Sequence, residues 1–282
     1  MAGARLLIVG GGRMGGALAG GLISLSSKIS DIAGTMAVVE PSERARSLLM
    51  ARHPRLVVLD DVAAAAGASD VGKGSLDVVL AVKPKDTKAA CVALAPFAPR
   101  RFLSIVAGVT TSLLEGWIGA SVPVVRAMPN TPALVRSGIS AIAPGRYASD
   151  SDLSWAESIL GAVGEVVRVP EGMIDAVTGL SGSGPAYVFL LAQAMVDAGI
   201  AAGLSRDVSC NLAFHTINGA GRMLLELPDG PEKLRDDVTS PGGTTAAGLR
   251  VLELRSVRSA IVEAVLAARD RSAELGREPA PE

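Results

Sequence analysis

The sequence has few cysteines, few aromatic residues and almost no net charge, and each shortage excludes a class of protein. Cys91 and Cys210 are far apart and belong to no CxxC spacing, so we expect two reduced thiols and neither a disulfide framework nor a metal site. Aromatic residues make up only 3% of the chain, and 27 basic residues nearly balance 28 acidic ones. The sequence has no basic stripe with interleaved aromatics, so a nucleic-acid partner is not expected.

Features of export and of membrane insertion are also scarce. The first apolar run, residues 5–9, is too short for the core of a signal peptide and leads into glycines instead of a cleavage site. Residues 185–204 approach the length of a membrane span, but Gln193 and Asp197 interrupt them, so we expect a helix buried in protein. The sequence therefore predicts a cytoplasmic protein without a membrane partner.

Apolar residues, in contrast, are plentiful, at 49% of a chain of 282 residues, a length that suits two domains. Short apolar segments alternate with helical patterns up to residue 168, and helices alone follow. We expect an α/β fold: a Rossmann-like, doubly wound, mostly parallel sheet over residues 1–168, an all-α dimerisation domain over 169–276 and a disordered tail over 277–282. The expected strands are 5–9, 36–39, 56–59, 77–82, 102–106, 122–127, 139–143 and 165–169, with a helix over about 151–163.

The first expected strand is followed by a glycine-rich turn and a helical pattern. Gly10, Gly12 and Gly15 fit the G-x-G-x-x-G fingerprint, in which Arg13 and Met14 stand before the last glycine. The first glycine permits a tight turn, the second lets a pyrophosphate approach the backbone, and the third lets the helix pack on the strand. A glycine-rich turn without a ligand is the alternative, but the succession of strand, turn and helix favours a dinucleotide site.

The end of the second expected strand bears on the choice of dinucleotide. Glu40 stands where an acidic residue can hold the adenosine ribose hydroxyls, which favours NAD. Ser42 and Arg44 follow, and a hydroxyl with a guanidinium can instead hold the 2′-phosphate of NADP. The choice between the two cofactors stays open, and a polar helix start is the alternative for all three residues.

Two further segments follow strands at what should be the same edge of the sheet. Lys83 and Pro84 place a cation and a rigid turn where doubly wound sheets bind ligands, although Lys83 could equally be a solvated lysine. Residues 126–132, Arg-Ala-Met-Pro-Asn-Thr-Pro, form a shaped loop directly after another strand.

Hydroxyl and glycine residues cluster in the second half of the chain. Residues 238–249 read Val-Thr-Ser-Pro-Gly-Gly-Thr-Thr-Ala-Ala-Gly-Leu, and a helical pattern begins at Thr245. Two adjacent glycines leave the backbone amides uncovered, and the free N–H groups of a first helical turn carry partial positive charge. The pattern suits a small carboxylate; an ordinary threonine-capped helix after a Pro-Gly turn is the alternative.

The other segments of the second half are expected to be helices as well. They cover 173–180, a stretch from Pro185, Ser205 to Leu227, a short stretch from Pro231, and a final one through Val257 and Leu266. The first should stop at Ser-Gly-Ser-Gly, residues 181–184. Helices between 185 and 227 are apolar on more than one face, which favours burial against a partner subunit over a thick monomeric core.

Together these motifs resemble the pyrroline-5-carboxylate reductases over essentially the whole chain. The resemblance rests on the fingerprint, on Val82-Lys83-Pro84, on 126–132, on Ser-Gly-Ser-Gly-Pro-Ala-Tyr at 181–187 and above all on Ser-Pro-Gly-Gly-Thr-Thr at 240–245. It implies a Rossmann domain and a helical domain that forms interlocked dimers, sometimes assembled into decamers. It also implies hydride transfer from NADPH or NADH, with NADPH the slightly favoured cofactor, to a cyclic imine, 1-pyrroline-5-carboxylate, which gives L-proline at the last step of its biosynthesis.

The resemblance implies roles for individual residues as well. Gly243, Thr244 and Thr245, with Ser240 beside them, are expected to hold the substrate carboxylate and ring nitrogen, and Glu171 is expected to reach the same ring. Residues expected to line the cofactor are the fingerprint residues with Glu40, Ser42, Arg44, Ala81, Val82, Lys83, Pro84, Ala107, Asn130 and Asp237. Arg13 departs from the amide residue common in the family, and Glu40 departs from the small hydroxyl usual in NADP-preferring members.

The implied reaction requires little acid–base catalysis by the protein, because a protonated ring imine accepts hydride once it is held and oriented. Thr245 is the candidate for hydrogen-bonding the ring nitrogen, and Glu171 would favour the iminium charge. His53 and His215 lack a partner pattern and are expected to be structural.

Two rival functions remain open at this point. A β-hydroxyacid or imine dehydrogenase of the same plan would call for a lysine between the domains, but no lysine lies between Lys88 and Lys233. Outside enzymes, the rival is a nucleotide-sensing protein without turnover, and the intact motif at 240–245 argues against it.

Overall fold

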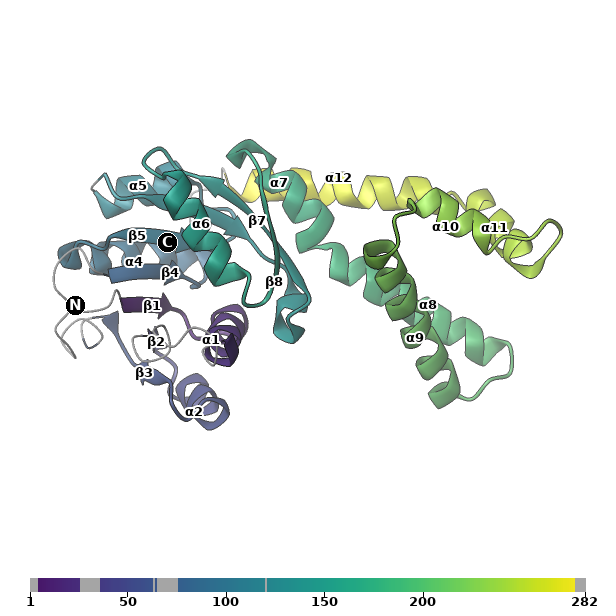
Figure 1. Cartoon of the computed structure of the whole chain (residues 1–282), viewed down its shortest axis with the longest axis horizontal. Coiled ribbons are helices and arrows are strands. Elements are labelled where there is room, and N and C mark those ends of the chain that lie inside the picture. The colour runs from purple at the N-terminus through teal and green to yellow at the C-terminus, as the bar shows by residue number, and fades with distance from the viewer. Residues whose placement is uncertain (1–4, 26–35, 63, 65–75, 120, 277–282) are drawn as a thin grey trace. The chain divides into compact units, whose positions relative to one another are not determined.

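The computed structural model describes residues 5–25, 36–62, 64, 76–119 and 121–276, which form two compact units (Figure 1). The first unit consists of residues 1–182 with 268–282, and the second of residues 183–267. The units divide after Gly182 and not at the expected position 168, because the segment behind the last strand packs on the sheet, where Ile174 is buried beside Ala141 and Ala143. The expected tail 277–282 lies outside the described residues.

The described part of the first unit holds an eight-stranded sheet in the order β3-β2-β1-β4-β5-β6-β7-β8. Its strands are β1 (Arg5–Val9), β2 (Met36–Val39), β3 (Val57–Leu59), β4 (Leu76–Leu80), β5 (Arg101–Ser104), β6 (Val124–Met128), β7 (Gly138–Pro144) and β8 (Gly164–Arg168). Neighbours from β3 to β6 pair in parallel, β6 and β7 antiparallel, and β7 and β8 in parallel again. The predicted Rossmann-like, mostly parallel sheet is confirmed, and its last two strands run against the first six.

The strands are apolar because helices cover both faces of the sheet. These helices are α1 (Arg13–Leu25), α2 (Glu43–Arg52), α4 (Thr87–Leu94), α5 (Thr111–Ile118) and α6 (Asp150–Leu160). On one face the fully buried Ile8 belongs to a core cluster with Leu18 of α1 and Ile159 of α6. On the other face Phe102 belongs to a cluster with Leu114 of α5. Full burial of each such side chain stabilises the fold by about 1.5–3 kcal/mol, so the alternating pattern determines a doubly wound sheet.

The segment behind β8 stays helical for longer than its sequence suggests. It forms the 3₁₀ turn η5 (Glu171–Met173), α7 (Ile174–Val177) and the π-helix η6 (Thr178–Gly182). The break between η6 and the next helix falls at Ser183, inside the expected stop at 181–184, but it is only one residue long. Two hydroxyls support the wide turn: Thr178 donates to the Ile174 carbonyl at 2.8 Å, and Ser181 donates to the Val177 carbonyl at 3.1 Å.

The second unit is helical, as predicted. It contains α8 (Gly184–Ala201), α9 (Arg206–Glu226), α10 (Pro231–Asp237), α11 (Thr244–Leu254) and the first part of α12 (Val257–Leu275). Ser205 is the N-cap of α9, where its hydroxyl accepts from the Val208 amide at 3.4 Å. From Ala268 onward α12 belongs to the first unit, where Ser272 donates to Asp175 at 2.7 Å.

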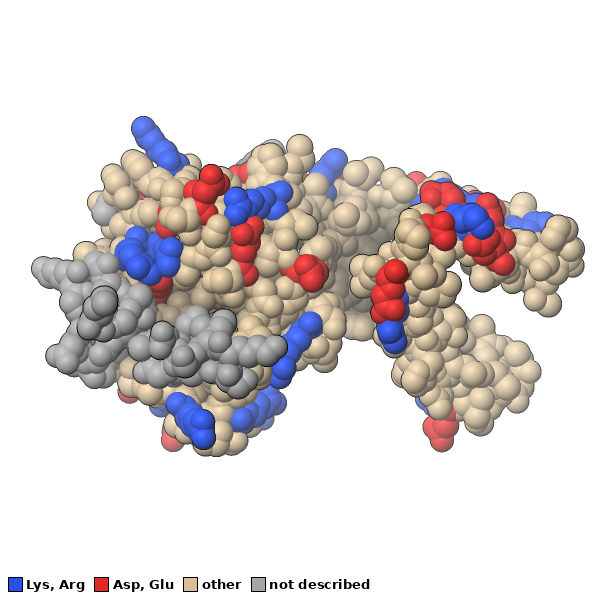
Figure 2. Space-filling model, in the orientation of Figure 1, with Lys and Arg blue, Asp and Glu red and all other residues tan. Residues whose placement is uncertain are grey.

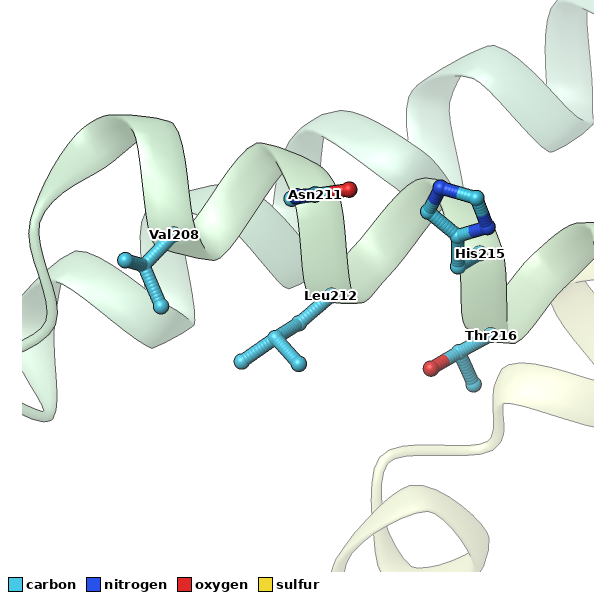
Figure 3. A pocket seen from close by; sticks show the side chains of 5 residues that line it. All are labelled: Val208, Asn211, Leu212, His215 and Thr216. Atoms are coloured by element: carbon cyan, nitrogen blue, oxygen red, sulfur yellow. The ribbon is translucent and has the colours of Figure 1, made fainter.

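Helices α8 and α9 carry large apolar side chains that the chain itself leaves exposed. Phe189 and Leu190 of α8 are 66% and 68% exposed, and Phe214 of α9 is 54% exposed. Figure 2 shows few charged side chains over the middle of these helices, in contrast to the mixed charges over α10 and α11. One side of α9 borders an open hollow of about 520 Å³ (Figure 3), lined by Val208, Asn211, Leu212, His215 and Thr216. An apolar surface of this kind calls for a cover.

A membrane is one conceivable cover, by helix length alone. Within the described residues, one stretch, Glu171–Ala201, is long and apolar enough to cross a bilayer. Little of it is buried inside the chain. Length and composition do not distinguish a membrane span from a helix that a second protein subunit covers. Other observations are needed to identify what covers the apolar surface of α8 and α9.

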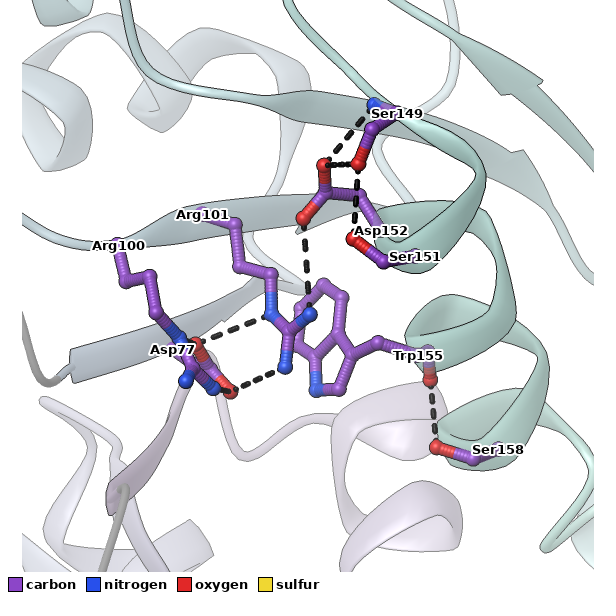
Figure 4. Close-up of polar contacts among 8 residues, drawn as sticks. All are labelled: Asp77, Arg100, Arg101, Ser149, Ser151, Asp152, Trp155 and Ser158. Carbon is purple, nitrogen blue, oxygen red and sulfur yellow. Dashed lines mark hydrogen bonds and ion pairs between the residues drawn. The ribbon is translucent and has the colours of Figure 1, made fainter.

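An ionic cluster ties α6 to the strands β4 and β5 (Figure 4). Asp77 is 4% exposed and accepts two hydrogen bonds from Arg100, at 2.7 and 2.5 Å, and two from Arg101, at 3.1 and 3.0 Å. Arg101 also lies over the Trp155 ring, 4.4 Å from its centroid, and pairs with Asp152 at 3.5 Å. One guanidinium thus connects the Asp77 carboxylate of β4 with a carboxylate and an aromatic face that both belong to α6.

Substituting Asp77 with Asn should therefore lower the free energy of unfolding by about 1–3 kcal/mol, because the partly buried guanidinium of Arg101 loses one of its two charged acceptors. Urea unfolding at neutral pH measures this loss. Asp150→Asn is the matched control: Asp150 pairs with Arg168 at 3.3 Å, but its side chain is 94% exposed, so no measurable change is expected. Equal effects of the two substitutions would contradict a stabilising role for the cluster.

Candidate dinucleotide and substrate site

Close backbone contacts surround the fingerprint glycines at the end of β1. Gly10 has φ +108°, and a Cβ there would lie 2.5 Å from the Ala81 carbonyl oxygen. A Cβ on Gly15 would overlap the Gly10 carbonyl oxygen, so a side chain is excluded at both positions. Gly12 has no atom within 4 Å of its would-be Cβ and stands directly before α1. This geometry leaves room for a pyrophosphate at the helix start.

The ends of four neighbouring strands meet at this edge of the sheet. The Gly10 amide donates to the Val39 carbonyl of β2, and the Ala81 amide donates to the Val9 carbonyl of β1, both at 2.8 Å. The Ile105 amide donates to the Leu80 carbonyl of β4 at 3.0 Å. The expected cofactor residues Ala81, Val82, Lys83 and Pro84 therefore follow β4 at the fingerprint, with Lys83 exposed, and Ala107 lies in the turn after β5.

Glu40 at the end of β2 is held by backbone amides. Its Oε2 accepts from the Gly11 amide and its Oε1 from the Ser42 amide, both at 2.9 Å. Ser42 also caps α2, accepting from the Ala45 amide at 3.4 Å. The expected ribose-binding trio is thus partly assembled: Glu40 and Ser42 are joined to each other and to the fingerprint loop, while Arg44 is exposed on α2.

Asn130 follows β6 and is 9% exposed. Its Oδ1 accepts from the Ile139 amide at 2.9 Å, and its own carbonyl accepts from the Ala133 amide at 3.2 Å. The side-chain oxygen therefore fixes the start of β7.

Glu171 lies at the N-terminus of α5. Its Oε1 accepts from the Thr111 amide at 2.7 Å, and its Oε2 accepts from the Thr111 hydroxyl at 2.7 Å. Arg126 of β6, whose side chain is 6% exposed, pairs with Oε1 at 3.3 Å. The carboxylate thus has an amide, a hydroxyl and a guanidinium around it, and it neutralises an arginine buried in the sheet.

The expected carboxylate cradle lies in the second unit and opens α11. Gly242 has φ +72°, in the left-handed region that favours glycine, and Gly243 is the N-cap of α11. No side chain caps this helix, so the threonine-capped alternative is wrong. The first hydrogen bond of the helical turn runs from the Ala247 amide to the Gly243 carbonyl at 3.2 Å. The amides of Thr244, Thr245 and Ala246 precede it and can serve an anion.

The structure groups the expected residues within each unit. In the first, the fingerprint, Glu40 and Ser42 are hydrogen-bonded neighbours, whereas Glu171 belongs to a separate cluster with Thr111. In the second, Ser240, Thr244 and Thr245 share one turn, and Asp237 ends α10, where it pairs with Lys233.

Sequence reasoning missed three contacts: Gly11 as the amide that holds Glu40, and Thr111 and Arg126 as partners of Glu171. Arg126 did carry a signal, since a charge inside an apolar strand calls for a buried partner.

His53 packs inside the first unit, as expected of a structural residue. His53 is the C-cap of α2. A Cβ on Gly20 would lie 2.9 Å from the Cε1 atom of the His53 ring, so the ring fills the space beside this glycine. His215 is exposed on α9. Burial raises the pKa of Cys91 to about 11, so this thiol stays protonated and unreactive at neutral pH. Within the described residues no group of three or more His, Cys, Asp or Glu side chains could hold a metal ion.

Comparison with known proteins identifies the family. A family model for pyrroline-5-carboxylate reductase dimerisation matches residues 171–275, beginning close to the expected domain start at 169. The pyrroline-5-carboxylate reductase of Mycobacterium tuberculosis is 39% identical over 297 residues, which cover 96% of this chain and 97% of the relative.

Two solved structures agree over nearly the full length. A pyrroline-5-carboxylate reductase from Coxiella burnetii has a TM-score of 0.86 and 33% identity, and covers 98% of this chain and 99% of that one. The Plasmodium falciparum pyrroline carboxylate reductase, solved with NADP bound, has a TM-score of 0.81 and 30% identity over the same shares. With an open fingerprint, an uncapped Ser-Pro-Gly-Gly-Thr-Thr turn and full-length relatives, this chain belongs to the pyrroline-5-carboxylate reductase family.

Proposed function

We propose that the protein reduces 1-pyrroline-5-carboxylate to L-proline with NADPH or NADH, the last step of proline biosynthesis. The observation that carries the proposal is the uncapped start of α11 at Gly242 and Gly243, in a chain of this family. The nicotinamide cofactor supplies the hydride, and the residues of the chain hold, orient and hydrogen-bond the imine.

In this proposal the substrate lies against the cradle by its carboxylate. The Gly243 amide already donates to the Ser240 carbonyl at 3.0 Å, so the amides of Thr244 and Thr245 bind the carboxylate oxygens, with the Ser240 hydroxyl beside them. The partial positive charge of the helix start attracts the anion. The Thr245 hydroxyl hydrogen-bonds the ring nitrogen. Protonation of that nitrogen makes the ring carbon a good hydride acceptor, so the hydroxyl orients the reacting bond and needs no catalytic triad.

The proposed cofactor residues divide by the part they would hold. Gly10, Gly12, Arg13, Met14 and Gly15 form the pyrophosphate turn, and Glu40, Ser42 and Arg44 lie on the ribose side. Ala81 to Pro84, Ala107, Asn130 and Asp237 remain proposed cofactor contacts. Asn130 and Asp237 already have partners, so any contact from them uses their remaining polar atoms.

Glu171 takes a changed role in the proposal. Its two oxygens already accept from Thr111 and pair with Arg126, so its charge is largely compensated. We propose that Glu171 is a positioning residue that fixes the start of α5, instead of a direct partner of the iminium ring.

The helical part of the chain is the dimerisation region of its family. We propose that a second subunit covers the apolar surface of α8 and α9, which leaves no need for a membrane, and that dimers assemble further into decamers in the cytoplasm. Phe189, Leu190 and Phe214 supply the exposed apolar area that such an interface requires.

The direct test is oxidation of NADPH and of NADH by the purified protein, followed by absorbance, with pyrroline-5-carboxylate as substrate. Turnover with this imine separates the proposal from a β-hydroxyacid dehydrogenase, which would oxidise a hydroxy acid instead. Cofactor binding without turnover of either substrate would identify a nucleotide-sensing protein and overturn the proposal.

Thr245→Ala should lower kcat roughly 30- to 1,000-fold, because one hydrogen bond that strengthens in the transition state is worth about 2–4 kcal/mol. Its backbone amide survives the change, so carboxylate binding and cofactor affinity should change little. Thr245→Ser keeps the oxygen and should keep most of the activity. Steady-state kinetics decide: an alanine variant within about twofold of wild type would remove Thr245 from the mechanism.

Glu171→Gln and Arg126→Met should each lower kcat/KM by about 3- to 30-fold, because each breaks the same partly buried pair. If Glu171 only positions α5, the double variant is no worse than the poorer single variant and the pH profile keeps its shape. Glu165→Gln, an exposed acid on β8, is the control and should behave as wild type. Additive losses with an altered pH profile would instead assign Glu171 to the substrate.

The protein should be an obligate dimer or a larger assembly of dimers, because α8 and α9 are too apolar to face water in a monomer. Sedimentation at low protein concentration measures this, and no active monomer is expected. Paired Phe189→Glu and Leu190→Glu substitutions should reduce both assembly and stability. Val135→Glu, which changes an apolar residue 74% exposed in the first unit, serves as control. A folded, active monomer of the unaltered protein would refute the prediction.

A further inference from the structure

The contacts of Glu40 bear on which of the two dinucleotides the protein prefers. Resting on the proposed reductase function, we infer that the protein binds NADH more tightly than NADPH, and that Glu40 is the residue that determines this specificity. The fingerprint fits a dinucleotide, because Gly12 leaves open space directly before α1 and neither Gly10 nor Gly15 can carry a side chain.

Glu40 is held in one position at the end of β2. The Gly11 amide donates to one carboxylate oxygen and the Ser42 amide to the other, both at 2.9 Å. A Cβ on Gly11 would lie 2.9 Å from the Glu40 Cβ and 2.5 Å from the Leu49 Cδ1 atom. Glycine at position 11 thus lets the acidic side chain lie against the fingerprint loop. If the carboxylate swung away, it would break both hydrogen bonds and leave the amide of the buried Gly11 without its acceptor.

A carboxylate at this point distinguishes the two cofactors by charge. In dinucleotide-binding folds the acid at the end of the second strand accepts from the ribose 2′-hydroxyl of NADH. In NADPH this hydroxyl is replaced by a phosphate that bears about 1.5 to 2 negative charges by analogy with phosphorylated side chains. The phosphate cannot donate as the hydroxyl does, and it is repelled by the fixed negative charge.

The arginines near this site offset the repulsion only in part. Arg46 donates from one nitrogen to the Glu40 carbonyl at 2.9 Å and to the Pro41 carbonyl at 2.7 Å, so it is engaged by the backbone. Arg44 is exposed and makes no hydrogen bond or ion pair in the described part of the chain, so a phosphate would have to immobilise a free side chain. Arg13 begins α1, at the turn proposed for the pyrophosphate, which both cofactors share. NADPH therefore remains usable but is bound more weakly.

Binding of each reduced cofactor to the full-length protein, without substrate, tests the inference. Calorimetry or nucleotide fluorescence should give a Kd for NADH at least about tenfold below that for NADPH. Glu40→Ser should shift the ratio of the two Kd values at least about tenfold towards NADPH. The control Glu43→Gln removes an exposed acid from the first turn of α2 and should leave the ratio within about twofold.

Two smaller ligands test whether the cofactor preference arises at the adenosine ribose. Wild type should bind 5′-AMP more tightly than adenosine 2′,5′-bisphosphate, and Arg44→Ala should weaken the bisphosphate more than 5′-AMP. An unaltered protein that prefers NADPH overturns the inference, as does a Glu40→Ser variant with an unchanged ratio. If Glu40→Ser does not fold, the wild-type ratio and the Arg44→Ala comparison still decide. A preference for NADH without pyrroline-5-carboxylate reduction would overturn the proposed function and leave this inference standing.

Discussion

The contact between the fingerprint loop and the end of β4 is the constraint on which the rest of the first unit depends. Gly10 meets the Ala81 carbonyl, and Gly15 meets Gly10, at distances that exclude any side chain. Because these contacts join β1, α1 and β4, they also set where the amides of the fingerprint point. The same close approach that completes the core therefore shapes the proposed pyrophosphate turn, so packing and cofactor binding cannot be altered separately here.

A second constraint is the arginine buried in β6. Its neighbours in the strand are apolar, and an unpaired guanidinium there would be costly, so Arg126 requires the carboxylate of Glu171. That carboxylate also serves the first turn of α5 through Thr111. Residue 171 is also the first residue that the dimerisation family model matches. The pair therefore ties the start of that segment to the sheet and to α5. It explains why the first compact unit continues past the last strand.

Much of the architecture could be predicted from local patterns. The runs 5–9 and 36–39 are the strands β1 and β2 as expected, because a sheet covered on both faces demands continuous apolar residues. The partners of Glu171 could not be predicted, since Thr111 and Arg126 are separated from it by 60 and 45 residues and only the folded sheet brings them together. Nor could the π-helix, because Ser-Gly-Ser-Gly is typical of a helix end and the hydroxyl contacts that sustain the turn are not visible in a pattern.

The start of each helix shows where the protein supplies its own anion and where it leaves a place for another. The first turn of α5 is served by Glu171 and by the Thr110 cap, and the start of α2 is served by Glu40 and Ser42. Helices α8 and α10 have a proline in their first turn, which removes a donor. Helix α11 begins on glycine, with neither a side-chain cap nor a proline in its first turn. The amides of its first turn therefore have no side-chain acceptor, and in the proposed function the substrate carboxylate takes that place.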